Sequence, residues 1–547
     1  MKERFDDLVS QIFNGLWEED PVEATYLGVH AYDCVLPRAD AARRADYSKQ
    51  RKGFLNSLEE FRNRESELDT PRRIDLGLLE AELEVSLRAD EEFRLPERRA
   101  DMYPSNALFG VYLLAMRRFA PMEERMAAIR DRLRDTPRFL REGVENLLGG
   151  ENIPRIWTET GIQTARGGEA LYGGVIPQLA AQVPSLEKEV NEAAKDALDS
   201  LGSYIKFLER ELLQRSSGNF AIGREAFDYL LGRKHGLPYD AGQLREIGGQ
   251  MIEETQRLLE KTAAKIDKNK TWPEIVETLK DDHTAADAIL DTYRREMEHA
   301  REFVEEKDLV TIPAGQNLQV VETPEFERAT LPYAAYVPPA AYEERQEGFF
   351  WVTPVDEQDG PRRQDQLRGH SNWGIPVTSL HEGFPGHHLQ FCRANTIDSA
   401  VRRQLMTTVY VEGWALYCEE MMQEQGFVSD PRNVLIRLKD QLWRACRVVV
   451  DVGLHCFGMG FDEAVEMMVG IAKLERANAE AEVRRYTMTP TQPMSYLIGK
   501  REILRLRDEV KSREGESFDL KRFHDSLLDY GAIPISLIRN DMLTERD

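Results

Sequence analysis

The chain has 547 residues and a mass of 62.8 kDa, more than one hydrophobic core usually supports, so we expect two packed lobes. Hydrophobic residues make up 41% and charged residues 31%, as in ordinary soluble globular proteins, and no apolar run approaches the roughly 18 residues of a membrane span. The formal net charge of −24 argues against nucleic acid and anionic membranes as partners, because both ligands need a basic surface.

The N-terminal segment and the cysteines bear on the cellular location. The run MKERFDDLVSQIF alternates charged and apolar residues as a surface helix does, and it lacks the basic, apolar and small-residue order of a signal peptide. The five cysteines are odd in number and scattered along the chain, so they predict no disulfide framework. These features predict a reduced, cytoplasmic protein.

Helical spacing of apolar residues dominates the first half of the chain. Spacings of three and four predict helices over 45–63, 72–95, 121–149, 183–214, 238–265 and 284–306. From 308 to 360 the chain is rich in proline, with β-favouring runs at 318–323 and 348–355, and helices resume beyond it. We therefore expect a mainly α protein with a helical N-terminal lobe over 1–307 and a second, catalytic lobe over 308–547, in which short strands precede the metal-binding helices.

The run SLHEGFPGHHLQ contains the most informative motif of the chain. Three of the ten histidines lie in it, and Glu382 directly follows His381. In the zincin motif H-E-x-x-H, two histidines one helical turn apart bind zinc, and the glutamate takes a proton from the bound water. Here the residue four positions after His381 is Pro385, and the next histidine is His387.

Neither following histidine could share an ion with His381 on a regular helix. Six residues rotate about 600°, which turns His387 roughly 120° away, whereas His388 returns to the same face about 10 Å further along the axis. Pro385 has no N–H and its ring collides with the carbonyl of His381, while Gly386 permits unusual backbone angles. The Pro-Gly pair is therefore predicted to distort the helix and bring one histidine back. We favour His387 as the ligand, with His388 turned outward or supporting the site, and the choice between them stays open.

The motif, together with EGWALYCEE further on, resembles the bacterial family catalogued as domain of unknown function 885. The resemblance extends to ATYLGVHAYD (24–33), QLWRACRVVVDVGLH (441–455) and PMSYLIGKREILRLR (493–507). This family is distantly similar to the helical gluzincins, which include angiotensin-converting enzyme, oligopeptidases and Taq-type carboxypeptidases. The resemblance implies a predominantly helical, two-lobed metallopeptidase-like fold with a small sheet beside the active-site cleft. It implies no particular substrate.

Glu412 is the predicted third ligand. It lies in VYVEGWALYCEE (409–420), which is predicted to form a buried amphipathic helix. In the gluzincins the third ligand is a glutamate from the next long helix, at a comparable distance along the chain. Two histidines and a glutamate with an open fourth position form a catalytic zinc site, so we expect one Zn²⁺ per chain, with Mn²⁺, Co²⁺ and Fe²⁺ as open alternatives. Glu419 and Glu420 are predicted to be surface charges or charges that support a ligand.

Three polar residues share one face of the predicted helix 441–457. Arg447, Asp451 and His455 follow one another at intervals of four. In a functional role, His455 lies near the metal and helps to stabilise the oxyanion, Asp451 orients its ring and Arg447 anchors the aspartate. The alternative is a buried ion-pair network that locks helices together. The sequence favours the two about equally.

Tyr496 and the segment from Phe349 to Thr353 are candidates for contact with the substrate. Zincins often supply a tyrosine to the developing oxyanion, and Tyr496 suits this task, although a tyrosine beside Leu497 is also an ordinary core residue. In the gluzincins a strand beside the cleft pairs with the extended substrate backbone. Phe349 to Thr353 is the candidate for that strand, with a plain hairpin over the core as the alternative.

We expect a zinc-dependent metallohydrolase, and more specifically a peptidase that cleaves short peptides or chain ends. Zn²⁺ held by His381, His387 and Glu412 lowers the pKa of a water molecule, and Glu382 passes the water proton to the leaving amine. The alternatives are hydrolysis of a non-peptide amide and a catalytically silent metal-binding protein of the same fold. Glu382 favours catalysis, because a structural site has no need of an acid beside its ligand. The expected partner is a short peptide or other small amide, and the oligomeric state is open.

Overall fold

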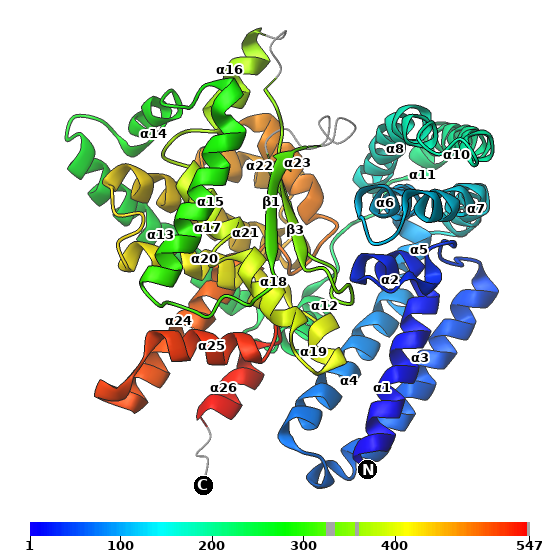
Figure 1. Ribbon diagram of the computed structural model, residues 1–547, viewed down its shortest axis with the longest axis horizontal. Helices are drawn as coiled ribbons and strands as arrows, with labels where there is room; N and C mark the ends of the chain where they lie inside the picture. Colours follow the sequence, from blue (N-terminus) through cyan, green and yellow to red (C-terminus); the bar gives the residue numbers. More distant parts are fainter. Residues whose placement is uncertain (324–333, 356–359, 544–547) are drawn as a thin grey trace. The chain divides into compact units, whose positions relative to one another are not determined.

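Two compact units make up the protein, for which the computed structural model describes residues 1–323, 334–355 and 360–543 (Figure 1). Unit 1 comprises Met1–Phe220 and Ala340–Arg345, and unit 2 comprises Ala221–Pro339 and Gln346–Asp547. The first division thus lies after residue 220, whereas the composition of the chain placed it after residue 307. The helices between these positions belong to unit 2, because the longest of them packs along a helix near the end of the chain.

Unit 1 is helical. Its main helices are α1 (Lys2–Glu19), α2 (Pro21–Leu27), α3 (Ala41–Arg62), α4 (Thr70–Glu91), α6 (Met102–Met116), α7 (Met122–Leu148), α8 (Arg155–Ala170) and α10 (Glu187–Phe207). The helices predicted from apolar spacing in this part of the chain are confirmed as α3, α4, α7 and α10. Arg132 of α7 is fully buried, and its guanidinium donates to the carbonyl oxygens of Pro21, Val35 and Gly110. These bonds satisfy a charge that would otherwise be costly to bury.

A short segment from later in the chain completes unit 1. Ala340–Arg345 lies between two strands that belong to unit 2. Within unit 1, the backbone N–H of Tyr342 donates to the carbonyl oxygen of Leu27 at 2.8 Å, and the Tyr342 ring meets that of Trp17 edge-on at 5.7 Å. Glu343 lies 3.6 Å from the ring of His30. The segment is therefore part of the packing of unit 1.

Unit 2 contains many helices and one small sheet. Its helices are α12 (Arg224–Tyr229), α13 (Ala241–Ile266), α14 (Trp272–Lys280), α15 (Ile289–Glu306), α16 (Gly360–Gly369), α17 (Ile375–Glu382), α18 (His387–Asn395), α19 (Ala400–Gln404), α20 (Thr408–Glu424), α21 (Pro431–Cys456), α22 (Phe461–Gly470), α23 (Arg476–Tyr486), α24 (Ser495–Glu514), α25 (Leu520–Asp529) and α26 (Ile535–Leu543). The most extensive helix contacts join α13 to α21 and α20 to α24. Across the described ranges, the helices are all too short or too polar to cross a bilayer.

The sheet of unit 2 has the strand order β1-β3-β2, formed by Asn317–Glu322, Glu347–Val352 and Ala334–Val337 respectively. The strands predicted at 318–323 and 348–355 are confirmed as β1 and β3. β3 is the central strand, parallel to β1 and antiparallel to β2, so both of its edges are already hydrogen-bonded. Of the two roles that the sequence left open for Phe349 to Thr353, pairing with a substrate is therefore excluded. Its nearly continuous apolar sequence is that of a strand buried on both faces.

Two glycines allow α20 and α24 to pack closely. A Cβ atom on Gly499 of α24 would lie 1.8 Å from the carbonyl oxygen of Val409, and one on Gly413 of α20 would lie 2.5 Å from the Cα atom of Gly499. No larger residue fits either position without moving a backbone. Gly413 and Gly499 thus permit the tight packing of the two helices. This contact brings the residues at the start of both helices into one region.

Replacing Gly499 by alanine should lower the free energy of unfolding by about 1–3 kcal/mol, because the added methyl group forces α20 and α24 apart. Denaturant unfolding measures this change. The matched control is Gly202→Ala in α10, where a Cβ meets no atom within 4 Å and the substitution should be neutral or slightly stabilising. Equal stabilities of the two variants would contradict the close approach.

Candidate metal centre

The histidine-rich motif lies where the chain turns out of α17 and into α18. The segment 383–386 separates these helices and is not helical. A Cβ atom on Gly386 would lie 1.8 Å from the carbonyl oxygen of His381, so this close approach requires glycine. The Trp414 indole of α20 donates to the carbonyl oxygen of Pro385 at 2.8 Å and ties the segment to that helix. The predicted Pro-Gly distortion is confirmed, and it is a complete interruption of the helix.

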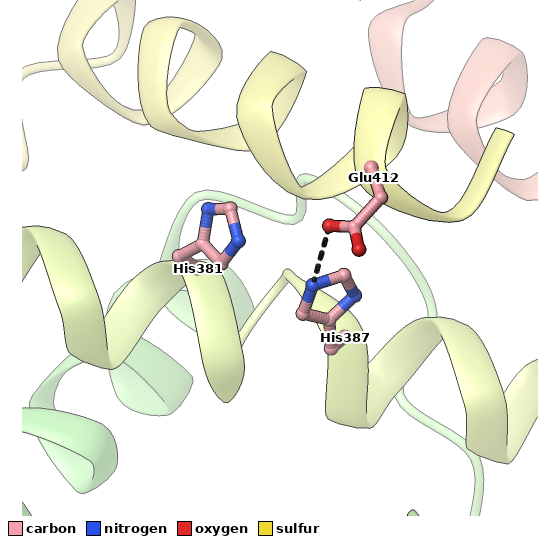
Figure 2. Close-up of side chains that lie close together, drawn as sticks. All are labelled: His381, His387 and Glu412. Carbon is pink, nitrogen blue, oxygen red and sulfur yellow. Dashed lines mark ion pairs between the residues drawn. The ribbon is translucent and has the colours of Figure 1, made fainter. Parts of the chain in front are cut away.

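The interruption brings His381, His387 and Glu412 together (Figure 2). One ligand atom from each residue lies within 4.8 Å of the other two. Nε2 of His387 is 3.5 Å from Oε2 of Glu412, and the centroids of the two imidazole rings are 4.9 Å apart. Figure 2 shows His381 on the last turn of α17, His387 on the first turn of α18 and Glu412 facing them from α20. The three predicted ligands thus lie side by side.

His388 faces away from this cluster. Its Nε2 atom is 2.7 Å from Oε1 of Gln316, and its Nδ1 atom is 3.1 Å from the hydroxyl of Tyr336 in β2. Burial lowers the pKa of His388 to about 3, so the ring is neutral at physiological pH. Both ring nitrogens hold the start of α18 against the sheet. Between the two histidines that the sequence left open, the geometry favours His387 as the ligand.

Glu419 supports His381 from behind. Its Oε1 atom lies 2.8 Å from Nδ1 of His381, and the side chain is only 2% exposed. A carboxylate that accepts a hydrogen bond from one imidazole nitrogen fixes the ring and leaves Nε2 for a metal. Of the two roles that the sequence left open for Glu419, the structure favours support of a ligand. The signal was its spacing, because residues seven apart, such as Glu412 and Glu419, share one face of a helix.

The charges of the cluster suit a divalent cation. Burial would raise the pKa of Glu412, but hydrogen bonds to His387 and Tyr496 and the charges of both histidines hold it below its ordinary value. Burial likewise lowers the pKa of His387, yet the hydrogen bond to Glu412 and the charges of Glu382 and Glu419 raise it above its ordinary value. His387 and Glu412 therefore hold a proton between them at a position where a metal cation can replace it. Two imidazoles and a carboxylate, with one ring already oriented, fit Zn²⁺.

Glu382 and Tyr496 lie beside the cluster. Glu382 is the last residue of α17, and its half-buried carboxylate adds to the negative field at His387. Tyr496, in the first turn of α24, is also half-buried and interacts with Glu412 through its hydroxyl. The structure therefore brings the predicted base and one predicted oxyanion donor to the three ligands.

The other predicted oxyanion donor does not join the cluster. Nε2 of His455 is 3.0 Å from the carbonyl oxygen of Tyr486. Asp451 accepts hydrogen bonds from the backbone N–H groups of Thr491 and Met494 at 3.3 and 3.2 Å, and it lies 3.9 Å from His455. The aspartate therefore fixes the turn before α24 more closely than it orients the histidine. For Asp451 and His455, these contacts favour a structural role over the functional one.

Tyr336 was missed by reasoning from the sequence. It lies in β2, and its ring is stacked with that of His387 at a centroid separation of 6.4 Å while its hydroxyl reaches His388. β2 has only four residues, too few for a reliable periodic pattern. Tyr336 places an edge of the sheet directly beside the candidate metal ligands.

The chain belongs to the family described as "Bacterial protein of unknown function (DUF885)", whose model matches residues 21–542. It is also similar to a solved structure described as "a putative lipoprotein of unknown function from Shewanella oneidensis", with 25% identity, a TM-score of 0.82 and coverage of 99% of this chain and 100% of that one. A second structure, described as "the putative lipoprotein from Colwellia psychrerythraea", is 18% identical with a TM-score of 0.83, covers 99% and 98% of the two chains, and shows the fold alone. No curated protein matches the chain.

Alanine substitution should identify the ligands. His381→Ala, His387→Ala and Glu412→Ala should each abolish stoichiometric zinc, because two remaining protein ligands hold the ion too weakly to compete with solvent. His388→Ala is the matched control and should keep the metal. Elemental analysis of protein dialysed against zinc measures the occupancy. Full occupancy in one of the first three variants removes that residue from the site, and loss only in His388→Ala shifts the ligand by one position.

Glu419→Gln should weaken zinc binding about 10–100-fold, because the amide supports the His381 ring less well than a carboxylate does. Competition with a chelator of known affinity gives the dissociation constant. Glu420→Gln is the control, since Glu420 pairs with Lys500 and contacts neither histidine ligand. Equal affinities of wild type and Glu419→Gln would show that the carboxylate does not support the ligand.

Proposed function

We propose that this protein is a zinc-dependent metallohydrolase, most specifically a peptidase of the gluzincin type that cleaves short peptides or chain ends. The supporting observation is the cluster of His381, His387 and Glu412, with the unliganded carboxylate of Glu382 beside it. Three protein ligands leave a coordination position open, as catalytic sites do, whereas structural zinc sites use four.

The gluzincin assignment is supported by the origin of each ligand. The two histidines come from one motif, and the glutamate comes from the next long helix, α20. A tyrosine from a later helix, Tyr496, also interacts with the glutamate. The mainly helical fold agrees with this assignment. The unusual spacing of His381 and His387 is compensated by the helix interruption, so that the ligand set is the same although the motif differs.

The residues around the cluster have separate chemical tasks. A bound divalent cation supplies Lewis acidity, which polarises an amide carbonyl and acidifies a water molecule. Glu382 can take the proton from that water and deliver it to the leaving amine. The hydroxyl of Tyr496 can donate to the carbonyl oxygen as negative charge develops there. Glu419 keeps the ring of His381 in the orientation that the other steps need.

The β2 strand is the proposed site of substrate pairing. It is the last strand in the order β1-β3-β2 and runs antiparallel to β3. An extended peptide that paired with β2 would pass Tyr336 and the ring of His387. A small amide other than a peptide is the remaining alternative substrate. We keep the cytoplasm as the proposed location. The description as a lipoprotein belongs to the two similar proteins and is not carried over to this chain.

Glu382→Gln should separate chemistry from binding. The amide keeps the shape of the side chain but cannot accept a proton, so we expect wild-type zinc content and turnover reduced at least about 100-fold. Hydrolysis of a mixed peptide library, followed by mass spectrometry with and without chelator, measures turnover and shows the cleaved bond. Glu305→Gln, at the surface of α15, is the matched control.

Three outcomes would contradict parts of this proposal. Loss of zinc in Glu382→Gln would make the glutamate a ligand. Full zinc and full turnover would assign the proton transfer to another base. A wild-type protein that binds zinc and cleaves neither peptides nor other amides would be the catalytically silent metal-binding protein.

A further inference from the structure

Arg447 contacts Tyr496, and not the aspartate that its spacing on α21 suggested. Its Cζ atom lies over the Tyr496 ring, 4.7 Å from the centroid, and over the Trp443 ring at 4.1 Å. Asp451 is occupied by backbone N–H groups of the turn before α24. The guanidinium therefore packs against aromatic faces, where a desolvated cation is attracted by the ring electrons.

The far side of the guanidinium is fixed by two polar partners. Nε of Arg447 donates to the hydroxyl of Tyr486 at 2.7 Å, and Nη2 lies 3.0 Å from Glu482. The Tyr486 hydroxyl in turn donates to Glu482 at 2.6 Å, so the three groups form a closed network. The remaining nitrogen, Nη1, has no hydrogen-bond acceptor in the described part of the chain. The hydrogen bonds to Tyr486 and Glu482 fix the plane of the guanidinium, so it cannot rotate away from the Tyr496 ring.

Burial determines how Arg447 can act. The arginine is only 4% exposed, so a substrate cannot reach it without a rearrangement. Tyr496 is half-buried and interacts with both the arginine and Glu412. We infer that Arg447 is a positioning residue that holds the Tyr496 side chain against the candidate metal ligand Glu412. The inference rests on the proposed function, because it takes Glu412 as a ligand and Tyr496 as the donor to the substrate.

The position of Tyr496 follows from this arrangement. Its ring lies against the arginine, and its side chain interacts with Glu412. Without the cation, the phenol would be free to turn toward solvent and lose its interaction with Glu412. Both the metal site and the substrate oxygen would then lose a fixed donor. Arg447→Met should therefore have the same consequences as Tyr496→Phe, although only the tyrosine touches the site.

A double-mutant cycle on zinc affinity tests the inference. Arg447→Met and Tyr496→Phe should each weaken zinc binding about 10-fold in competition with a chelator, as is usual for a lost supporting contact. The double variant should also be about 10-fold weaker, because both changes remove one shared contact. A combined loss of about 100-fold, or wild-type affinity in Arg447→Met, would overturn the inference.

Crystal structures of the wild-type protein and Arg447→Met test the geometry without reference to metal. The Tyr496 ring should leave Glu412 in the variant, and an unchanged ring would overturn the inference. Failure of the wild type to bind zinc would instead refute the proposed function, so the two failures are distinguishable. If Arg447→Met does not fold, Tyr486→Phe replaces it: this change removes one of the groups that hold the guanidinium and should displace Tyr496 in the same direction. An undisturbed Tyr496 in Tyr486→Phe would then overturn the inference.

Two further measurements exclude a merely structural role. Arg125→Met in unit 1 removes another buried arginine, which donates to backbone carbonyl oxygens, and it should lower the melting temperature while zinc affinity stays unchanged. In a peptide assay, Arg447→Met should lower kcat with little change in KM, and Arg447→Lys should be intermediate because it keeps the charge but loses the planar hold. A rise in KM alone would mean that Arg447 binds the substrate directly, and would overturn the inference.

Discussion

The candidate centre depends on the close approach of Gly386 to the carbonyl oxygen of His381. Without room for that approach the turn could not form, and on a regular helix His387 would lie on a different face from His381. The turn shortens the path between the two histidines and leaves each of them on a rigid helical turn. The bond from Trp414 to the same turn connects it to α20. One backbone constraint thus places the two histidines and the helix that carries Glu412.

The candidate metal ligands could be predicted from the sequence, because the two histidines lie in one motif and the resemblance to the gluzincins implied the glutamate. The proline and glycine predict the interruption of the helix. The two histidines and the glutamate are residue types that indicate a divalent cation. The choice between His387 and His388 could not be made, because a rotation of a few backbone angles decides it. The contacts with Gln316 and Tyr336 that occupy His388 join segments far apart in the chain.

The predictions that failed concern which element packs against a helix or strand that was itself predicted correctly. Arg447, Asp451 and His455 do share one face of α21, but spacing on a helix does not reveal the neighbouring helix. The strand over Phe349 to Thr353 was predicted correctly, but the sequence could not decide whether it lies at an edge of the sheet, because pairing is a long-range property. The first division of the chain was misplaced for the same reason, since α13 packs on a helix about two hundred residues further along the chain.

Charges of both signs act on Tyr496, although the protein as a whole is strongly acidic. Burial and the charge of Glu412 raise its pKa, and the charges of Arg447, Arg485 and Arg444 oppose them without reversing the shift. The phenol therefore keeps its proton at neutral pH, as a donor must. The formal net charge of −24 gave no indication of this group of arginines.

The segment Ala340–Arg345 affects how the protein can be divided. The chain leaves unit 2 after β2, contributes six residues to unit 1 and returns to form β3. A fragment that ends at residue 220 lacks the partners of Leu27, Trp17 and His30, and a fragment that begins at residue 221 carries these partners with nothing to bind. Neither unit is encoded by one continuous stretch of the gene. Recombination or truncation at residue 220 would therefore divide a folding unit, although the sequence there looks like a simple boundary.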